Sequence, residues 1–544
     1  MRVKTTPKSK AGPLSQTRSL ARTRALRTAV VEPPEPSAAA QATVDAGGTP
    51  TLGHGGQAGF VDRLVALRMG TPLGPVHAAS VNSVESSAPV ASAHNLAEES
   101  KTWDATQTAA LIRSGEVSAV EVVQAAITRA KATDAELHAI VHELYAQGLA
   151  AATSERRGCF AGVPTFIKDM EDLAGAPTGL GSAAIKPGPA QETAASVAQF
   201  LSSGTITIGK SSTAEFGLNA TTEPVFGKPT CNPHHLGHSV GGSSGGAAAL
   251  VAAGVVPIAH GGDGGGSIRI PAAFCGLVGL KASRGRLVPM ATSKRMPVKL
   301  ATYGVLTRSV RDTAAFFAEV DHPIQGLAPI GKVEGPGNTK RRIGVFIDPP
   351  NGTPVDPEVR AACLAVAKTL EGQGHQVDFV PAPYDQQLVD DFLLHWGLLA
   401  FGVEQIVKRQ PGGDVERLEP WTRNLAQQAK KNWWRIPTAI WRLRRYQAKY
   451  EETFRRCDVL LSPTTAAPAP KLGYLSADQP YEQQVERLLT LLPYTPVQNT
   501  SGGPAISVPV AKNKDGLPIG VQLASPMGEE RRLLELAFAL EHQG

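Results

Sequence analysis

Two clusters of glycine and serine constrain this chain more than any other feature. The first reads Gly-Gly-Ser-Ser-Gly-Gly over residues 241–246, and the second reads Gly-Gly-Asp-Gly-Gly-Gly-Ser over residues 261–267. Glycine adopts positive φ angles and allows close backbone approach, so such clusters can wrap N–H groups around an anion. Ser267 closes the second cluster and places a hydroxyl beside those donors. The pattern indicates a nucleophile next to an anion-binding backbone.

Lys168 is the candidate base for this nucleophile. It follows Phe166 and Ile167 in an apolar segment, where burial would lower its pKa and leave a neutral amine. None of the histidines has neighbours that favour a role as base. The first cluster is not the G-x-S-x-G elbow of α/β-hydrolases, because no strand leads into Ser243. A serine–serine–lysine arrangement is the simplest device that these residues can build.

The composition is that of a soluble globular protein. Of 544 residues, 42% are hydrophobic and 19% are charged, and the richest apolar run, residues 247–258, is too short to span a membrane. The first 31 residues contain eight Lys and Arg and no acid, whereas 46 basic and 48 acidic residues lie beyond them. We therefore expect neither a stable membrane span nor a nucleic-acid-binding face on the folded part.

The chain is predicted to divide at about residue 98. Residues 1–98 are rich in Pro, Ala, Ser, Thr and Gly and lack sustained periodicity, so we expect a disordered N-terminal extension that the chemistry does not need. The basic start resembles an organellar transit peptide; a disordered tail or a start site assigned too far upstream explains it equally well. We expect a cytoplasmic protein.

Beyond residue 98, helical and strand-like patterns alternate. Helical spacing covers residues 105–114, 118–132 and 194–201, and strand patterns cover residues 138–141, 205–208 and 342–347. Ser118 with Glu121 forms a capping-box signature, and Asp356 with Pro357 begins a further helix. This alternation predicts one α/β domain over residues 99–544, with a central sheet covered on both faces by helices.

Residues 204–211 match the phosphate-binding pattern G-x-x-x-x-G-K-[ST], but we expect no nucleotide site there. The four residues between the glycines are Thr-Ile-Thr-Ile, which is strand material, and a helix rather than a strand precedes Gly204. Lys210 is interpreted as a structural residue just past a strand.

Cysteines and histidines give no sign of a metal site. The five cysteines are scattered and show no Cys-x-x-Cys spacing, and His234, His235 and His238 lie in a loop without metal-ligand spacing. We expect reduced cysteines, no metal and no cofactor.

From about Lys101 to its end, the chain resembles the amidase signature family. The segments that carry the resemblance are G-V-P-T-F-I-K-D (162–169), G-G-S-S-G-G (241–246), G-D-G-G-G-S-I-R-I-P-A-A-F-C-G (262–276), G-L-K-A-S-R-G-R (279–286), D-V-L-L-S-P-T (458–464), N-T-S-G-G-P-A-I-S-V-P (499–509) and G-L-P-I-G-V-Q-L (516–523). The resemblance implies the amidase signature fold, a mixed central sheet wrapped by helices. Residues 219–224 and the C-terminal pattern also resemble bacterial 6-aminohexanoate cyclic-dimer hydrolases.

The resemblance implies a role for each site residue. It makes Ser267 the nucleophile, Ser243 the bridging serine after a cis peptide bond, and Lys168 the base. Further roles fall to the oxyanion-hole residues Gly264, Gly265 and Gly266, with the N–H of Ser267, and to the supporting residues Ser244, Asp263 and Arg269. Gly262 and Ala282-Ser283 depart from the family pattern, which puts substrate fit in doubt rather than activity.

We therefore expect hydrolysis of a small-molecule carboxamide through a serine acyl-enzyme. One alternative is the glutaminase component of a tRNA-dependent amidotransferase, which would need an ammonia channel and a second protein as its partner. A second alternative is a non-catalytic binding scaffold, which the intact set of candidate residues disfavours. A homodimer stays open.

Residues 421–446 concentrate tryptophan among basic side chains. Trp421, Trp433, Trp434 and Trp441 lie there, four of the six tryptophans of the chain. The segment fits a surface helical pair with its tryptophans packed inward, a hydrophobic wall over the acyl-binding channel, or a basic aromatic helix that docks on a membrane. We predict that Trp433, Trp434 and Trp441 contact the substrate.

Overall fold

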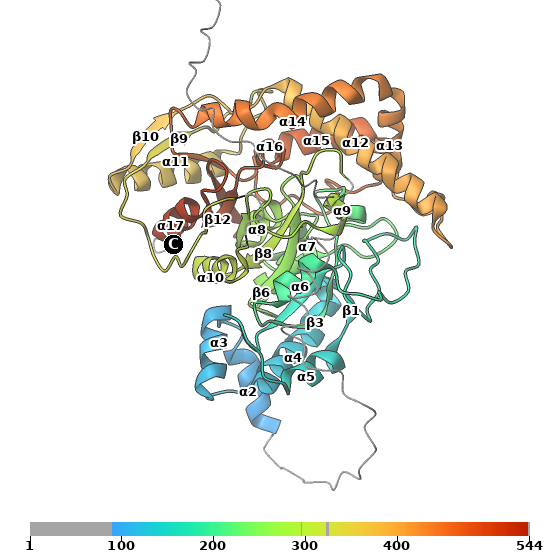
Figure 1. Cartoon of the computed structure of the whole chain (residues 1–544), viewed down its shortest axis with the longest axis vertical. Helices are drawn as coiled ribbons and strands as arrows, with labels where there is room; N and C mark the ends of the chain where they lie inside the picture. Colours follow the sequence, from blue (N-terminus) through green and yellow to red (C-terminus); the bar gives the residue numbers. More distant parts are fainter. Residues whose placement is uncertain (1–89, 295, 323–325, 542–544) are drawn as a thin grey trace, which may run out of the picture. The chain divides into compact units, whose positions relative to one another are not determined.

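The computed structural model describes residues 90–294, 296–322 and 326–541. The chain separates into two units, Met1–Glu85 and Ser86–Gly544, and every element described below belongs to the second unit (Figure 1). The expected transit-like start and most of the expected extension therefore lie outside the described residues.

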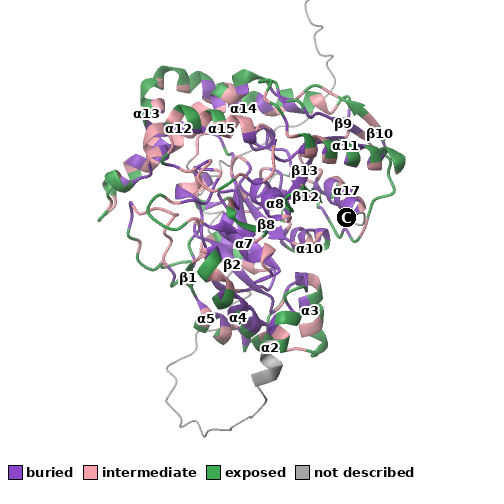
Figure 2. Ribbon diagram, turned by 180° about the vertical axis from the view of Figure 1, so that it is seen from behind, coloured by how far each residue is buried: buried purple, intermediate pink, exposed green. Residues whose placement is uncertain are grey.

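An eight-stranded sheet forms the centre of this unit. Its strands lie in the order β10 (Gln376–Phe379), β9 (Arg342–Val345), β11 (Val459–Pro463), β13 (Pro518–Ala524), β12 (Ala505–Lys512), β7 (Val278–Lys281), β8 (Thr302–Thr307) and β6 (Ile258–Asp263). Strands β10, β9 and β11 are parallel and the other neighbours are antiparallel, so the sheet is mixed. All residues of β6, β7, β11 and β13 are buried, as expected when both faces are covered (Figure 2). The predicted α/β class is confirmed.

A smaller sheet delivers the candidate base. Its order is β1 (Ile140–Glu143), β3 (Ile206–Ser211) and β2 (Pro164–Lys168), with β2 parallel and β1 antiparallel to β3. Strand β2 packs against β6 of the large sheet and ends at Lys168. A short hairpin pairs β4 (Cys231–Asn232) with β5 (His235–Ser239).

Helices surround the two sheets. The α-helices are α2 (Val90–Glu99), α3 (Ala105–Ser114), α4 (Ala119–Leu137), α5 (Tyr145–Ala152), α6 (Ala195–Leu201), α7 (Gly245–Ala252), α8 (Arg269–Cys275), α9 (Ala291–Lys294), α10 (Val310–Val320), α11 (Pro357–Gly372), α12 (Gln386–Arg409), α13 (Pro420–Lys431), α14 (Ile436–Thr453), α15 (Tyr481–Leu491), α16 (Pro496–Ser501) and α17 (Glu530–Glu541). Short 3₁₀ turns are η1 (Glu215–Gly217), η2 (Val415–Arg417) and η3 (Trp433–Arg435). Helices α12 to α14 pack together as one layer, at the top of Figure 1.

Local sequence signals account for the helix ends that were predicted. The Ser118 hydroxyl accepts from the Glu121 N–H, and the Glu121 carboxylate accepts from the Ser118 N–H at 2.8 Å, so the capping box at α4 is present. Asp356 caps α11, and Pro357 occupies its first turn. The strand expected at 138–141 is confirmed as β1, although it begins at Ile140 because His138, with φ of 50°, ends α4.

The structure also explains the phosphate-loop look-alike. Strand β3 includes Gly209 and Lys210, so the segment is a strand rather than a flexible loop. The Lys210 ammonium is buried, where it pairs with Asp169 at 2.9 Å and donates to the Thr178 hydroxyl at 2.7 Å. Lys210 is therefore a structural residue, although it lies inside the strand rather than past its end.

The predicted boundary at residue 98 is placed too late. Helix α2 spans Val90–Glu99, packs against α4 and buries Ala97. The buried Arg129 guanidinium donates to the Ala97 carbonyl at 2.8 Å and to the Ser100 hydroxyl at 2.6 Å. A buried cation needs such acceptors, so α2 is part of the folded domain.

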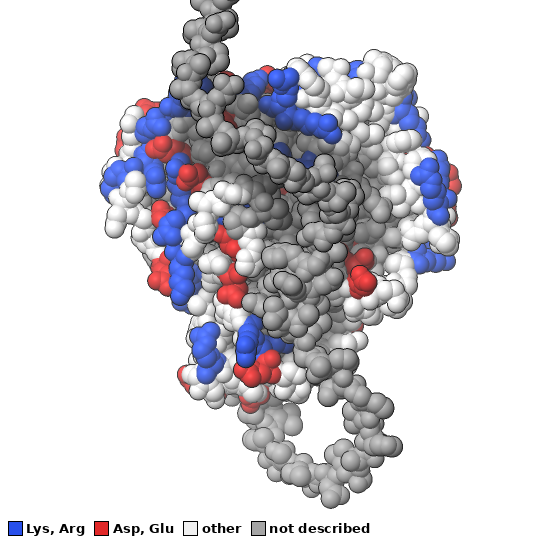
Figure 3. All heavy atoms as spheres, viewed as in Figure 1, with Lys and Arg blue, Asp and Glu red and all other residues white. Residues whose placement is uncertain are grey.

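Surface charge and helix hydrophobicity bear on the nucleic-acid-binding and membrane-spanning classes that the sequence analysis considered. On the face drawn in Figure 3, blue and red side chains lie intermixed along the left edge, and much of the remaining described surface there carries neither charge. Within the described residues, the helices lack the length and apolar character that crossing a bilayer requires.

The contacts of Arg129 predict how far the N-terminus can be shortened. A chain that begins at Lys101 loses both the Ala97 carbonyl and the Ser100 hydroxyl, which leaves the buried guanidinium short of acceptors at a cost of about 1–3 kcal/mol. We expect its melting temperature to fall by several degrees below that of a chain that begins at Ser86. Equal melting temperatures in a calorimetric comparison would show that α2 contributes nothing to stability.

Candidate active site

Three chain segments bring the predicted site residues together. Lys168 ends β2, Ser243 and Ser244 directly precede α7, and Ser267 lies between β6 and α8. All four residues are buried; Ser267 retains the largest exposed fraction of them, 7%. The helix and strand ends position these side chains where two covered sheets meet.

The Lys168 amine lies between two serines. Its Nζ donates to the Ser243 Oγ at 2.7 Å and to the Ser244 Oγ at 3.0 Å, with the Gly262 carbonyl at 3.5 Å. The Gly242–Ser243 peptide bond is cis, as the family resemblance implies. Lysine and bridging serine are thus in direct hydrogen-bond contact, as a proton relay requires.

Burial tunes this lysine toward neutrality. Removal from water lowers the pKa of Lys168 to about 7, although the negative charges of Asp263 and Glu171 oppose the shift. At a pKa near 7, a large share of the amine is unprotonated around neutral pH and can accept a proton from a hydroxyl.

Ser244 connects the lysine to the second glycine cluster. Its hydroxyl donates to the Gly262 carbonyl at 3.1 Å and accepts from the Gly262 N–H at 3.2 Å. The Ser244 N–H donates to the Ser267 carbonyl at 3.3 Å. These contacts hold the two serine-bearing segments side by side.

The Ser267 hydroxyl is not yet part of this network. Among the described residues, it makes no hydrogen bond with Ser243 or with Lys168. The structure therefore joins lysine to bridging serine, whereas the last link of the expected relay, from Ser243 to Ser267, is not formed.

The glycine run before Ser267 is held in a turn that only glycine allows at one position. Gly266 has φ of 127°, and a Cβ there would lie 2.3 Å from the Thr495 Oγ1. Its N–H donates to the Asp263 carboxylate at 2.7 Å, and the Thr495 hydroxyl donates to the Gly265 carbonyl at 2.8 Å. The Gly266 N–H is thus already engaged.

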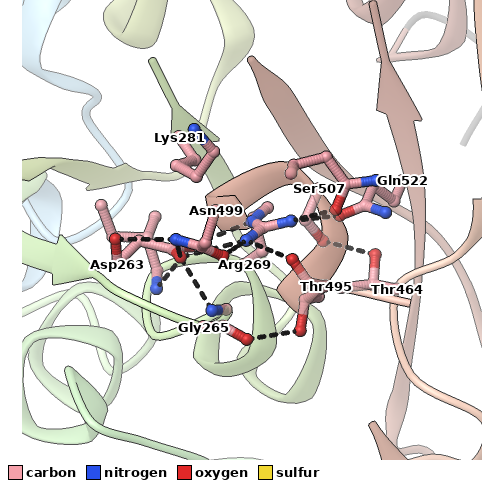
Figure 4. Close-up of polar contacts among 12 residues, drawn as sticks. Asp263, Gly265, Arg269, Lys281, Thr464, Thr495, Asn499, Ser507 and Gln522 are labelled. Carbon is pink, nitrogen blue, oxygen red and sulfur yellow. Dashed lines mark hydrogen bonds and ion pairs between the residues drawn. The ribbon is translucent and has the colours of Figure 1, made fainter. Parts of the chain in front are cut away.

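A buried ion pair anchors this turn (Figure 4). Arg269 Nε lies 2.9 Å from Asp263 Oδ2, and both side chains are fully enclosed. The guanidinium also donates to the carbonyl of Thr495 and to the amide oxygens of Gln498, Asn499 and Gln522, while the Asn499 amide donates to Asp263. Burial alone would raise the pKa of Asp263, but Arg269 and Asn499 hold it well below its ordinary value.

The contact of Trp433, Trp434 and Trp441 with substrate stays a prediction, and the structure places all three side chains at the surface. Trp433 and Trp434 lie in η3 and Trp441 in α14, with exposed fractions of 68%, 60% and 56%. They do not pack inward; the Arg445 guanidinium lies over the Trp441 ring at 4.8 Å. Trp421 alone of the four is buried.

The sequence analysis missed the aromatic residues that do reach the site. Phe392 and Trp396 project from α12 toward Gly264 and Gly265, the nearest approach being 3.1 Å from the Phe392 ring to an ideal Gly265 Cβ position. Their spacing of four residues predicts that they share one face of a helix. The same spacing is typical of any apolar helix face that packs on a core, so it does not by itself indicate a site.

No group of three or more metal-ligating side chains occurs within the described part of the chain. The described cysteines are all free thiols, and burial raises the pKa of Cys231, Cys363 and Cys457.

The Asp263–Arg269 pair gives a stability prediction. Replacing Arg269 by Met leaves the Asp263 carboxylate buried without its counter-ion, a loss that typically costs about 3–5 kcal/mol. Urea unfolding of Arg269→Met should show this loss relative to the unaltered chain. Solvent-exposed ion pairs contribute up to about 1 kcal/mol to stability. A loss of unfolding free energy below about 1 kcal/mol would therefore mean that the pair does not anchor the turn.

Comparison with known proteins identifies the family. The sequence profile described as Amidase matches residues 121–534. A Mycobacterium leprae protein provisionally named amidase AmiC is 42% identical over 443 residues, which cover 80% of this chain and 94% of that protein. A 6-aminohexanoate-cyclic-dimer hydrolase of a Pseudomonas strain is 35% identical over 473 residues, covering 80% and 94%.

Solved structures of related amide hydrolases have the same fold as this chain. A substrate complex of a 6-aminohexanoate cyclic dimer hydrolase superposes with a TM-score of 0.74 at 31% identity and covers 81% of this chain and 97% of that one. A bacterial aryl acylamidase of the amidase signature family superposes with a TM-score of 0.71 at 26% identity, covering 81% and 96%. The chain therefore belongs to the amidase signature family and is a hydrolase of the C–N bond of amides.

Proposed function

We propose that this protein hydrolyses a small-molecule carboxamide through an acyl-enzyme on Ser267. Neutral Lys168 accepts the proton of Ser243, Ser243 accepts that of Ser267, and the Ser267 oxygen attacks the amide carbonyl carbon. The relay then returns the proton to the leaving nitrogen as the C–N bond breaks. Water attacks the ester, passes its proton to Ser267 by the same route, and releases the carboxylic acid.

One observation carries the proposal: a buried lysine donates to two serine hydroxyls, with its pKa lowered to about 7 by burial. Lys210, the structural lysine on the neighbouring strand, is paired with Asp169, and the buried Lys281 donates to the Ala282 carbonyl. Lys168 instead has hydroxyls and a carbonyl as its hydrogen-bond partners. This arrangement supports proton transfer rather than ion pairing.

The backbone donors for the tetrahedral oxyanion are a narrower set than the sequence suggested. Because the Gly266 N–H donates to Asp263, we assign the oxyanion to the N–H groups of Gly264, Gly265 and Ser267. Gly266 then acts as the hinge of the turn, and the Asp263–Arg269 pair keeps the other donors in place. Such preorganised donors typically contribute about 3 kcal/mol each to transition-state stabilisation.

The glutaminase alternative gains no particular support. The solved glutamyl-tRNA(Gln) amidotransferase component from Thermotoga maritima is 23% identical, which shows the shared fold alone. Closer relatives named for cyclic-dimer hydrolysis and aryl acylamide cleavage favour a free-standing amide hydrolase. A homodimer stays a prediction.

The assignment of Ser267 predicts one site of covalent modification. A fluorophosphonate should form a single adduct, and peptide mapping should place it on Ser267, while Ser267→Ala loses both the adduct and amide turnover. We expect turnover to fall by at least about 10³-fold, as for loss of a catalytic nucleophile. An adduct on Ser243 or Ser244 would contradict the assignment.

The role of Lys168 predicts a pH profile. Below its pKa of about 7 the amine is protonated and cannot accept a proton, so kcat/KM should rise with pH through an ionisation near 7 and level off above it. Lys281 is the matched control, because burial lowers its pKa to about 7 as well. The pH profile of Lys281→Met should still show the ionisation near 7. Loss of that ionisation in Lys281→Met would mean that the profile reports Lys281 and not Lys168.

A further inference from the structure

Helix α12 brings two aromatic rings against the loop that carries the nucleophile. The Phe392 Cζ lies 3.1 Å from an ideal Cβ position on Gly265, and the Trp396 Cη2 lies 3.4 Å from that on Gly264. The rings stack with centroids 5.3 Å apart and planes 17° from parallel. Since the N–H groups of these glycines are our oxyanion donors, the ring pair borders the place of the reacting carbonyl.

A shared anchor fixes the orientation of this pair. The Trp396 indole N–H donates to the Leu218 carbonyl at 2.9 Å, and the buried Trp421 donates to the same oxygen at 2.9 Å. Leu218 follows Gly217, where a Cβ would lie 3.3 Å from the Ser243 Oγ. One carbonyl therefore ties the aromatic pair to the segment beside the bridging serine.

The surroundings of the site are apolar, and they are partly open. Phe392 and Trp396 are half-buried and pack against the core, and Gly264 and Gly265, which they touch, are half-buried as well. Half-buried Met170 is the side chain nearest to Gly217, and Ala301 lies near Gly264. Asp391, next to Phe392 on α12, is paired with Arg442, so its carboxylate is neutralised away from the rings.

We propose that Phe392 and Trp396 form the specificity-determining wall of the substrate site and select amides that bear a planar apolar group, such as an aryl ring, over small aliphatic amides. The inference rests on the proposed function, because it takes Ser267 as the reacting centre. A flat ring of the substrate stacks on the fixed aromatic pair, a contact that a small alkyl group cannot reproduce. The two residues bind and orient substrate and take no part in proton transfer.

The test compares two substrate pairs on the full chain. Benzamide against isobutyramide varies the acyl side, and acetanilide against N-propylacetamide varies the amine side. We expect a preference for the aromatic member of about tenfold or more in kcat/KM in at least one pair. Phe392→Leu and Trp396→Leu should reduce that preference by about 3- to 10-fold, mostly through KM, while Trp396→Phe, which keeps a flat ring, should retain most of it.

Phe379→Leu is the matched control for Phe392→Leu, because it makes the same change at an exposed phenylalanine of β10 and should leave the ratio unchanged. The proposal is overturned if the original chain prefers the aromatic member in neither pair. It is overturned equally if both leucine variants keep the ratio, or if they lose all four activities in parallel with a lower melting temperature. Fluorophosphonate labelling of Ser267 separates the cases: failure to label the original chain refutes the acyl-enzyme itself, whereas labelling without aromatic preference refutes the wall alone.

Discussion

The enclosed ion pair between Asp263 and Arg269 is the interaction on which the rest of the site depends. A salt bridge cut off from water repays its desolvation only when further hydrogen bonds satisfy both partners, and here Thr495, Gln498, Asn499 and Gln522 supply them. Those partners come from α16, the residue before it, and β13, far away in the sequence. The pair thereby fixes the turn of Gly264 to Gly266 against the C-terminal part of the sheet and leaves Ser267 at its end. The geometry of the proposed nucleophile is thus a property of the whole domain.

Burial also sets the charge state of the proposed base. Lys168 ends a strand whose residues are all buried, and its amine meets hydroxyls instead of a carboxylate. Lys210, on the neighbouring strand, is equally enclosed but faces Asp169. Two lysines on adjacent strands of one small sheet thus differ in their hydrogen-bond partners, because Lys210 contacts a carboxylate and Lys168 contacts serine hydroxyls. The difference separates a structural cation from a candidate catalytic amine.

The parts of the fold and site that the sequence predicted are those encoded locally. The capping box of Ser118, the strand expected at residues 205–208 and the glycine clusters around Ser243 and Ser267 depend on neighbouring residues, and the structure contains them, with the strand running on to Ser211. Contacts between distant segments were not predictable: Phe392 and Trp396 read as an ordinary helix stripe until α12 is placed on Gly264. Trp433 shows the same limit from the other side, since aromatic residues among basic ones fit a pocket wall, a packed helix pair and an exposed surface alike, and its exposure is set by the packing of distant segments. The start of the domain was misplaced because α2 is held by the distant Arg129 rather than by its own periodicity.

The central claim is that Lys168 is a neutral amine near physiological pH. The most direct measurement is an NMR titration of the chain carrying lysine labelled with ¹³C at Cε, with the Lys168 resonance identified by its loss in Lys168→Met. The account predicts a shift change with a midpoint near 7, where burial places its pKa. A midpoint near the ordinary value of a lysine, about 10.4, would contradict it, because the amine would then be protonated whenever the enzyme works.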